Sequence, residues 1–167
     1  MKVAIVGLSQ STRHLAPWSD PDWELWGLAW DSERYCFDRT FEMHDMPDLA
    51  LFYGDSLAAY LEKISDCSRL YTPENYPFDE VAKTTGDYWT SSMAYCMALA
   101  IHEGAKEIAL YGIDMTDDYG YQRPNMEYLI GFARGRGIKV HIPQQSPLCK
   151  HANPADRDYA GRYGRSK

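Results

Sequence analysis

The chain has 167 residues, 45% of them hydrophobic, and a formal net charge of -7 at pH 7. This size and composition predict a single compact domain over residues 1–150, and the acidic balance argues against a nucleic-acid partner, which needs clustered Lys and Arg. The four cysteines lack metal-ligand spacing and no apolar run could cross a bilayer, so we expect a cytoplasmic protein with reduced thiols, no metal site and no membrane contact.

The first part of the chain predicts three strands and two helical segments. Residues 2–7 form a short apolar run closed by glycine, typical of a strand buried on both faces of a parallel sheet. A helical turn at 13–16 follows, with Ser9 or Ser11 as its N-cap. Two strands at 23–30 and 40–44 and a helix at 55–64 complete this part.

The second part continues the alternation of strands and helices. We expect a strand at 69–72, a long loop at 73–87, a helix at 88–103, a strand at 107–111, a helix at 125–136 and a strand at 138–142. Alternating strands and helices predict an α/β protein with a Rossmann-like three-layer fold and a mainly parallel sheet. Residues 151–167 form a basic C-terminal tail, for which we expect disorder; contact with a partner is the alternative.

Ligands in such sheets bind outside the carboxyl ends of the strands, so the residues there are the candidates. The first strand runs into a turn with Gly7, Ser9, Ser11 and Thr12, where a glycine, hydroxyl groups and free N–H groups suit a phosphate or a ribose. It matches neither a G-x-G-x-x-G nor a Walker motif, and a plain capped turn explains it about as well.

The hydroxyl residues Thr90, Ser91 and Ser92 begin the clearest helix and form a second anion-ready position, with simple helix capping as the alternative. Asp114 follows a buried strand and could hold a ribose hydroxyl, act as a base, or merely cap the next turn.

Strand alternation places His44 on the same face as Glu42, with Asp45 next in the chain. A carboxylate orients an imidazole and raises its basicity, so His44 is a candidate acid/base and Asp45 a candidate ligand contact. A structural hydrogen bond is the alternative for this histidine.

Three further ligand candidates precede the last helix. Tyr121 could stack on a ring, Gln122 could bind a polar group, and Arg123 could pair with a phosphate or a carboxylate. An ordinary polar surface loop is the alternative.

The segment from Thr90 to Asp114, including Gly104-Ala105-Lys106, resembles bacterial sialyltransferases of the lipooligosaccharide type. It also resembles related motility-accessory proteins and archaeal hydroxymethylpterin pyrophosphokinases with the same Rossmann-like core. The resemblance implies that the first turn and the start of the 88–103 helix hold the phosphate and sugar of a nucleotide, with Asp114 near the ribose or base. The pairing of Trp26-Gly27 with Glu42–Asp45 and Tyr121–Arg123 is similar to small bacteriophage proteins, which would place the protein in the host cytoplasm.

The sequence also departs from the sialyltransferase pattern. These enzymes carry a catalytic His before the last helix and strand, whereas residues 121–125 contain none. Leu8-Ser9-Gln10 replaces their Asn-Gly-Pro, and the chain is too short for their lid.

The leading hypothesis is an enzyme that binds a nucleotide or nucleotide-sugar and carries out glycosyl or phosphoryl transfer, or hydrolysis, with His44 or Asp114 as acid/base. The alternatives are a module that binds or sequesters a nucleotide without chemistry, and an accessory subunit that acts through its surface. No cofactor beyond the nucleotide is predicted, and homo-oligomerisation is a further expectation.

Overall fold

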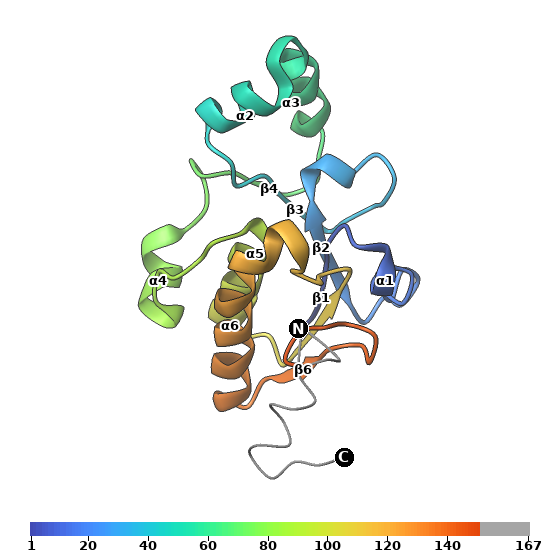
Figure 1. Ribbon diagram of the computed structural model, residues 1–167, viewed down its shortest axis with the longest axis vertical. Helices are drawn as coiled ribbons and strands as arrows, with labels where there is room; N and C mark the ends of the chain where they lie inside the picture. Colours follow the sequence, from blue (N-terminus) through green and yellow to red (C-terminus); the bar gives the residue numbers. More distant parts are fainter. Residues whose placement is uncertain (151–167) are drawn as a thin grey trace.

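The computed structural model describes residues 1–150, with the side chains of 117–119 left aside (Figure 1). Its centre is one six-stranded sheet in which every neighbouring pair is parallel, in the order β4-β3-β2-β1-β5-β6. The strands are β1 (Lys2–Val6), β2 (Glu24–Leu28), β3 (Arg39–Phe41), β4 (Leu70–Tyr71), β5 (Glu107–Tyr111) and β6 (Lys139–His141). The predicted α/β fold with a parallel sheet is confirmed.

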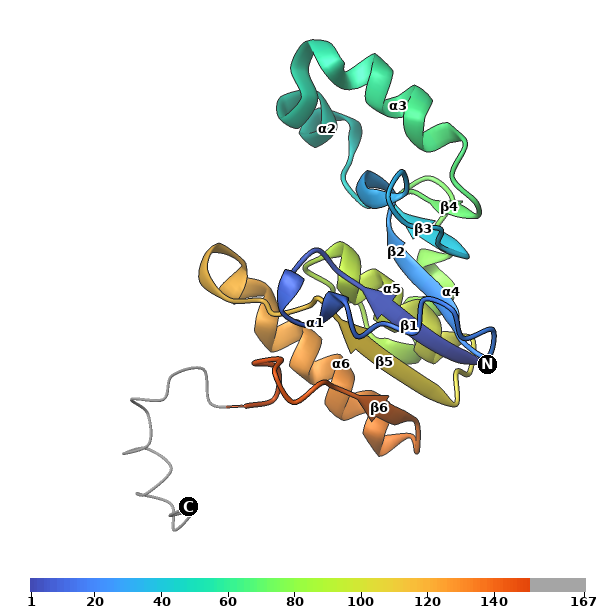
Figure 2. The same cartoon turned by 90° about the vertical axis from the view of Figure 1, so that its right-hand side faces the viewer.

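Helices connect the strands, as parallel pairing requires. They are α1 (Gln10–Arg13), α2 (Met46–Tyr53), α3 (Leu57–Ser65), α4 (Phe78–Thr85), α5 (Ser92–His102) and α6 (Arg123–Gly135), with short 3-10 turns at η1 (Ala29–Asp31), η2 (Gly54–Ser56) and η3 (Asp117–Gln122). Figures 1 and 2 both show α2 and α3 at one end of the molecule, beyond β3 and β4. No helix of the described part is long and apolar enough to span a bilayer.

The two faces of β1 pack into different clusters, which is why its run of apolar residues does not alternate with polar ones. Val3 and Ile5 join the main core with α5, where eight of the nine residues from 93 to 101 are buried and most of these are Ala or Met, which let the helix lie close to the sheet. Ala4 and Val6 pack on the other face against Ala16 and Phe37. A third cluster lies under α2 and α3.

The strand order reverses between β1 and β5, and two glycines allow the loops after these strands to touch. A Cβ on Gly7 would lie 2.4 Å from the carbonyl oxygen of Gly112, and one on Gly112 would lie 2.7 Å from that of Gly7. Gly112 also has φ +62°, which favours glycine. The N–H of Ser9 donates to the Gly112 carbonyl at 2.9 Å. The chain therefore forms a tight seam where open α/β sheets bind ligands.

Two helices were not predicted, and two others have different bounds. The segment 73–87, expected to be a loop, contains α4, whose N-cap is Pro77 and which ends at Gly86. Helix α2 was not predicted at all; it starts with Asp45 as N-cap and Pro47 in its first turn. The helix expected at 88–103 begins only at Ser92, and the first helical turn is at 10–13 rather than 13–16. The predicted tail at 151–167 lies outside the described residues.

Candidate functional site

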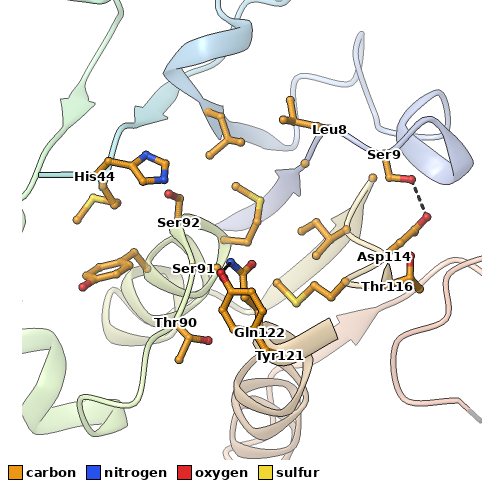
Figure 3. Close-up of a pocket in the computed structure, with 18 of the residues that line it drawn as sticks. Leu8, Ser9, His44, Thr90, Ser91, Ser92, Asp114, Thr116, Tyr121 and Gln122 are labelled. Carbon is orange, nitrogen blue, oxygen red and sulfur yellow. Dashed lines mark hydrogen bonds between the residues drawn. The ribbon is translucent and has the colours of Figure 1, made fainter. Parts of the chain in front are cut away.

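A pocket of about 910 Å³ lies at the carboxyl end of the sheet, a volume suited to a nucleotide-sized ligand. Its walls come from the loops after β1, β3 and β5 and from the start of α5 (Figure 3). Helix α2 also contributes to the lining. Nine of the thirteen predicted site residues line it: Gly7, Ser9, His44, Thr90, Ser91, Ser92, Asp114, Tyr121 and Gln122. Residues far apart in the sequence are thus brought together around one cavity.

Asp114 forms one wall of the pocket together with the first turn. The hydroxyl of Ser9 donates to Asp114 Oδ2 at 2.6 Å, and that of Ser11 donates to Oδ1 at 2.8 Å. These bonds tie the loop after β5 to the loop after β1 and orient the carboxylate. Each carboxylate oxygen can accept a second hydrogen bond, so Asp114 can still receive a ligand hydroxyl.

The N-terminus of α5 forms the floor of the pocket between its two ends. Ser91 is the N-cap, and its hydroxyl accepts from the N–H of Ala94 at 3.2 Å. The N–H and the hydroxyl of Thr90 both donate to Oδ1 of Asn125, a fully buried residue of α6. Helix α6 therefore fixes the segment that leads into α5, and the positive end of the α5 dipole lies at the pocket.

His44 and Glu42 form a dyad opposite Asp114; in Figure 3 the two ends of the pocket are marked by His44 and by the bond between Ser9 and Asp114. His44 Nδ1 lies 2.6 Å from Oε1 of Glu42. The Glu42 side chain is 8% exposed and that of His44 is 48% exposed. The second oxygen of Glu42 accepts a hydrogen bond from Tyr60, which stacks on Tyr53.

The dyad shifts the protonation of both partners. The hydrogen bond to Glu42 raises the pKa of His44 above its usual 6.5, and partial burial opposes this only in part. Burial tends to raise the pKa of Glu42, but the hydrogen bonds from His44 and Tyr60 outweigh it and hold the pKa below its usual value. An ionised Glu42 can only accept, so Nδ1 carries the proton and Nε2 of the neutral ring is a base.

The other four predicted site residues do not line the pocket. Ser11 reaches it only through Asp114. Thr12 is fully buried and accepts from the N–H of Gly112 at 2.8 Å, so it supports the seam between β1 and β5. Asp45 caps α2 through the N–H of Asp48 at 2.9 Å.

Arg123 is engaged away from the pocket. Its guanidinium pairs with Glu127 at 2.8 Å and donates to the carbonyl oxygens of Pro147 and Lys150 at 2.5 and 2.6 Å. Arg123 therefore holds residues 147–150 against α6. Arg13 likewise forms a buried ion pair with Asp31.

The charge of the pocket is unusual for a nucleotide site. Asp48 and Asp114 line it, and no Lys or Arg is found among the described residues that do so. The positive contributions come from the α5 dipole and, when it is protonated, from His44. Within residues 1–150, no group of three or more His, Cys, Asp or Glu is placed to hold a metal ion.

The sequence did not reveal several residues that α2 and α5 contribute to the pocket. Asp48 and Phe52 reach the pocket from α2, and Tyr95 reaches it from the second turn of α5. A signal for α2 was present, because Asp45 followed by Pro47 and Asp48 has the pattern of a capped helix start. Recognising it would have placed an exposed aromatic residue, Phe52, near the end of β3.

Comparison with known proteins supports the fold. No family model and no curated protein matches the sequence. The sialyltransferase CstII from Campylobacter jejuni, solved with the substrate analogue CMP-3FNeuAc, has a TM-score of 0.56 at 16% identity, over 91% of this chain and 85% of that chain. A point mutant of the α-2,3/8-sialyltransferase CstII has a TM-score of 0.53 at 16% identity, over 88% and 82% of the two chains.

At this identity the likeness concerns the fold alone. The predicted resemblance to sialyltransferases is confirmed at that level, while the resemblances to motility-accessory proteins, pterin pyrophosphokinases and bacteriophage proteins stay predictions. The chain has the α/β fold of these CstII structures.

Proposed function

We propose that this protein binds a nucleotide-sugar in the 910 Å³ pocket and transfers the glycosyl group to a hydroxyl acceptor. The observation that carries the proposal is the Glu42–His44 dyad at one end of a pocket whose other end is the Ser9–Asp114 pair. The Asp114 carboxylate suits the ribose of such a donor, and the helix N-terminus suits its phosphate. His44, at the other end, is a general base for the acceptor hydroxyl.

Each wall has a task in this proposal. Asp114 accepts hydrogen bonds from the ribose hydroxyls, and the hydroxyls and free N–H groups at Ser91 and Ser92 receive the phosphate. His44 Nε2 removes the proton of the acceptor hydroxyl as its oxygen attacks the anomeric carbon. The bond between that carbon and the phosphate oxygen breaks, and the nucleotide leaves with the electron pair. Glu42 stabilises the imidazolium that forms.

The resemblance to sialyltransferases and the shared fold with CstII also support glycosyl transfer. The CstII structure with TM-score 0.56 was solved with a cytidine-nucleotide sugar analogue, CMP-3FNeuAc. This chain lacks a His in residues 121–125, where those enzymes are expected to carry theirs. His44 supplies an imidazole at the pocket from the loop after β3.

The test incubates the protein with a panel of nucleotide-sugars and measures the products by mass spectrometry. We expect one donor to give free nucleotide together with either a glycosylated acceptor or the free sugar released by hydrolysis. His44→Asn is expected to abolish turnover while nucleotide binding persists. A donor that binds tightly but is recovered intact with every acceptor would contradict the proposal.

A second candidate is a nucleotide-binding module without chemistry. The absence of Lys and Arg from the described lining of the pocket favours it, because transferases commonly use such cations to stabilise a leaving phosphate. The same panel distinguishes the two candidates, since a pure binder raises the melting temperature with a ligand that is recovered unchanged after denaturation.

A further inference from the structure

A second cavity of about 330 Å³ lies beside the main pocket, on the side of α2 and β3. The two cavities share five lining residues: Leu8, Leu28, His44, Phe52 and Ser92. Four residues line the smaller cavity only, and they are Trp30, Phe41, Glu42 and Tyr53. The nucleotide-sugar donor occupies the main pocket, so the smaller cavity is free for another ligand. Its volume is large enough for a single six-membered ring with its substituents.

Aromatic side chains dominate this smaller cavity. The ring of Trp30 lies 5.7 Å from that of Tyr53, centroid to centroid, and Tyr53 is held in turn by stacking on Tyr60 at 3.9 Å. Trp30 is 51% exposed and Phe52 is 60% exposed, although both lie at the site. Such half-exposed aromatic faces favour a ligand with a flat apolar face.

The dyad lies at the boundary of the two cavities. His44 lines both, whereas Glu42 lines only the smaller one. Because Glu42 occupies Nδ1, the nitrogen available to a substrate is Nε2. The His44 ring is also fixed from the side by Phe52, whose ring meets it edge-on at 5.2 Å. A hydroxyl group held against the aromatic walls therefore comes within reach of a base that also faces the donor pocket.

We propose that the 330 Å³ cavity is the acceptor subsite and takes a ring of monosaccharide size with an apolar face and a hydroxyl group at its edge. This inference rests on the proposed function. The acceptor hydroxyl loses its proton to His44 Nε2 and its oxygen forms the new bond to the anomeric carbon, while the bond from that carbon to the phosphate breaks. Pyranosides and aromatic alcohols share this chemistry.

The experiment follows the indole N–H signals of ¹⁵N-labelled protein during titration with methyl β-galactopyranoside in one arm and benzyl alcohol in the other. Both arms are run with and without a nucleoside monophosphate. We expect one alcohol to shift the Trp30 signal in both conditions and to leave the Trp23 signal unchanged, because Trp23 lines neither cavity. The arm that responds identifies the acceptor class.

Matched variants separate the subsite from general effects on α2 and its neighbours. Trp30→Ala is expected to weaken the apparent affinity for the responding alcohol about tenfold, the loss of one aromatic wall, with nucleotide affinity unchanged. Leu51→Ala is the control, since Leu51 is 79% exposed on α2 and lines neither cavity.

Two results would overturn the inference: a Trp30 signal that neither alcohol moves, or competition between the nucleotide and the alcohol for the same signal. A different result would refute the proposed function instead: no nucleotide binds at the Ser91 and Ser92 amides, but the alcohol still shifts the Trp30 signal. The smaller cavity would then still bind a ring. The two failures are therefore distinguishable.

Discussion

At the scale of single residues, the Glu42–His44 dyad makes a prediction about pH. A general base acts only when unprotonated, and Glu42 raises the pKa of His44 above 6.5. Turnover is therefore expected to fall as the pH drops through a value above 6.5. In Glu42→Gln the pKa of His44 falls, so the acid limb of the rate profile moves to lower pH.

The same substitution lowers the plateau rate, by about a hundredfold or more, because the ring loses the partner that fixes its tautomer. Steady-state rates from pH 5 to 9, together with an NMR titration of the His44 ring, measure both effects. An acid limb that does not move in Glu42→Gln would show that another group is the base.

Asp114 makes a second prediction at this scale. Its carboxylate accepts from Ser9 and Ser11, so an Asn amide in its place would present a donor to one of these hydroxyls and lose an acceptor for the ribose. We expect Asp114→Asn to weaken nucleotide binding about tenfold or more, as for a lost charge-assisted hydrogen bond. Calorimetry measures the affinity, and Asp66→Asn is the control, since Asp66 is exposed at the end of α3. Unchanged affinity would remove Asp114 from the binding site.

At the scale of elements, the seam between β1 and β5 sets the shape of the pocket. Gly112→Ala forces a left-handed conformation on alanine and brings its Cβ within 2.7 Å of the Gly7 carbonyl. The conformation alone costs about 1–2 kcal/mol, and the overlap adds about 1–3 kcal/mol. Gly104→Ala is the matched control, because Gly104 has φ +74° with nothing within 4 Å of the added Cβ. Urea unfolding should show a clearly larger loss of stability for Gly112→Ala; equal losses would mean that the loops relax apart.

The elements also show how far the sequence alone reaches. The strands were predictable because β1 and β5 are continuous apolar runs, and the carboxyl-end rule then placed Ser9, His44 and Asp114 at one edge. Helix α4 was not, since it buries only Val81 and Thr85, and Pro77 and Gly86 at its two ends indicated a loop.

The site was predictable where strand ends and the segments leading into helices determine it. Arg123 has the chemistry of a phosphate ligand, and nothing in the sequence reveals that α6 turns it toward the carbonyl groups of Pro147 and Lys150. Phe52 was missed for a similar reason, because its place depends on how α2 packs across the end of β3. Contacts between elements distant in sequence decide both cases.

At the scale of the whole molecule, the charge distribution selects among nucleotides. The protein carries a net charge of -7, and the described lining of the main pocket holds Asp48 and Asp114 but no Lys or Arg. Each phosphate added to a ligand therefore brings negative charge that the pocket does not neutralise, whereas the α5 N-terminus can receive one phosphate. The pocket is therefore expected to bind a donor with a single phosphate more tightly than a donor with two.

We therefore expect affinity to fall along a series of nucleoside mono-, di- and triphosphates with the same base, by about tenfold from first to last. Because the repulsion is between partly exposed charges, the difference should narrow as ionic strength rises and the screening length shortens. Calorimetric titrations at low and high salt measure it. Asp48→Asn removes one of the two carboxylates and should recover part of the triphosphate affinity while leaving the monophosphate nearly unaffected. If the triphosphate binds most tightly in the unmodified protein, cations outside the described lining neutralise it, and the pocket does not select nucleotides by charge.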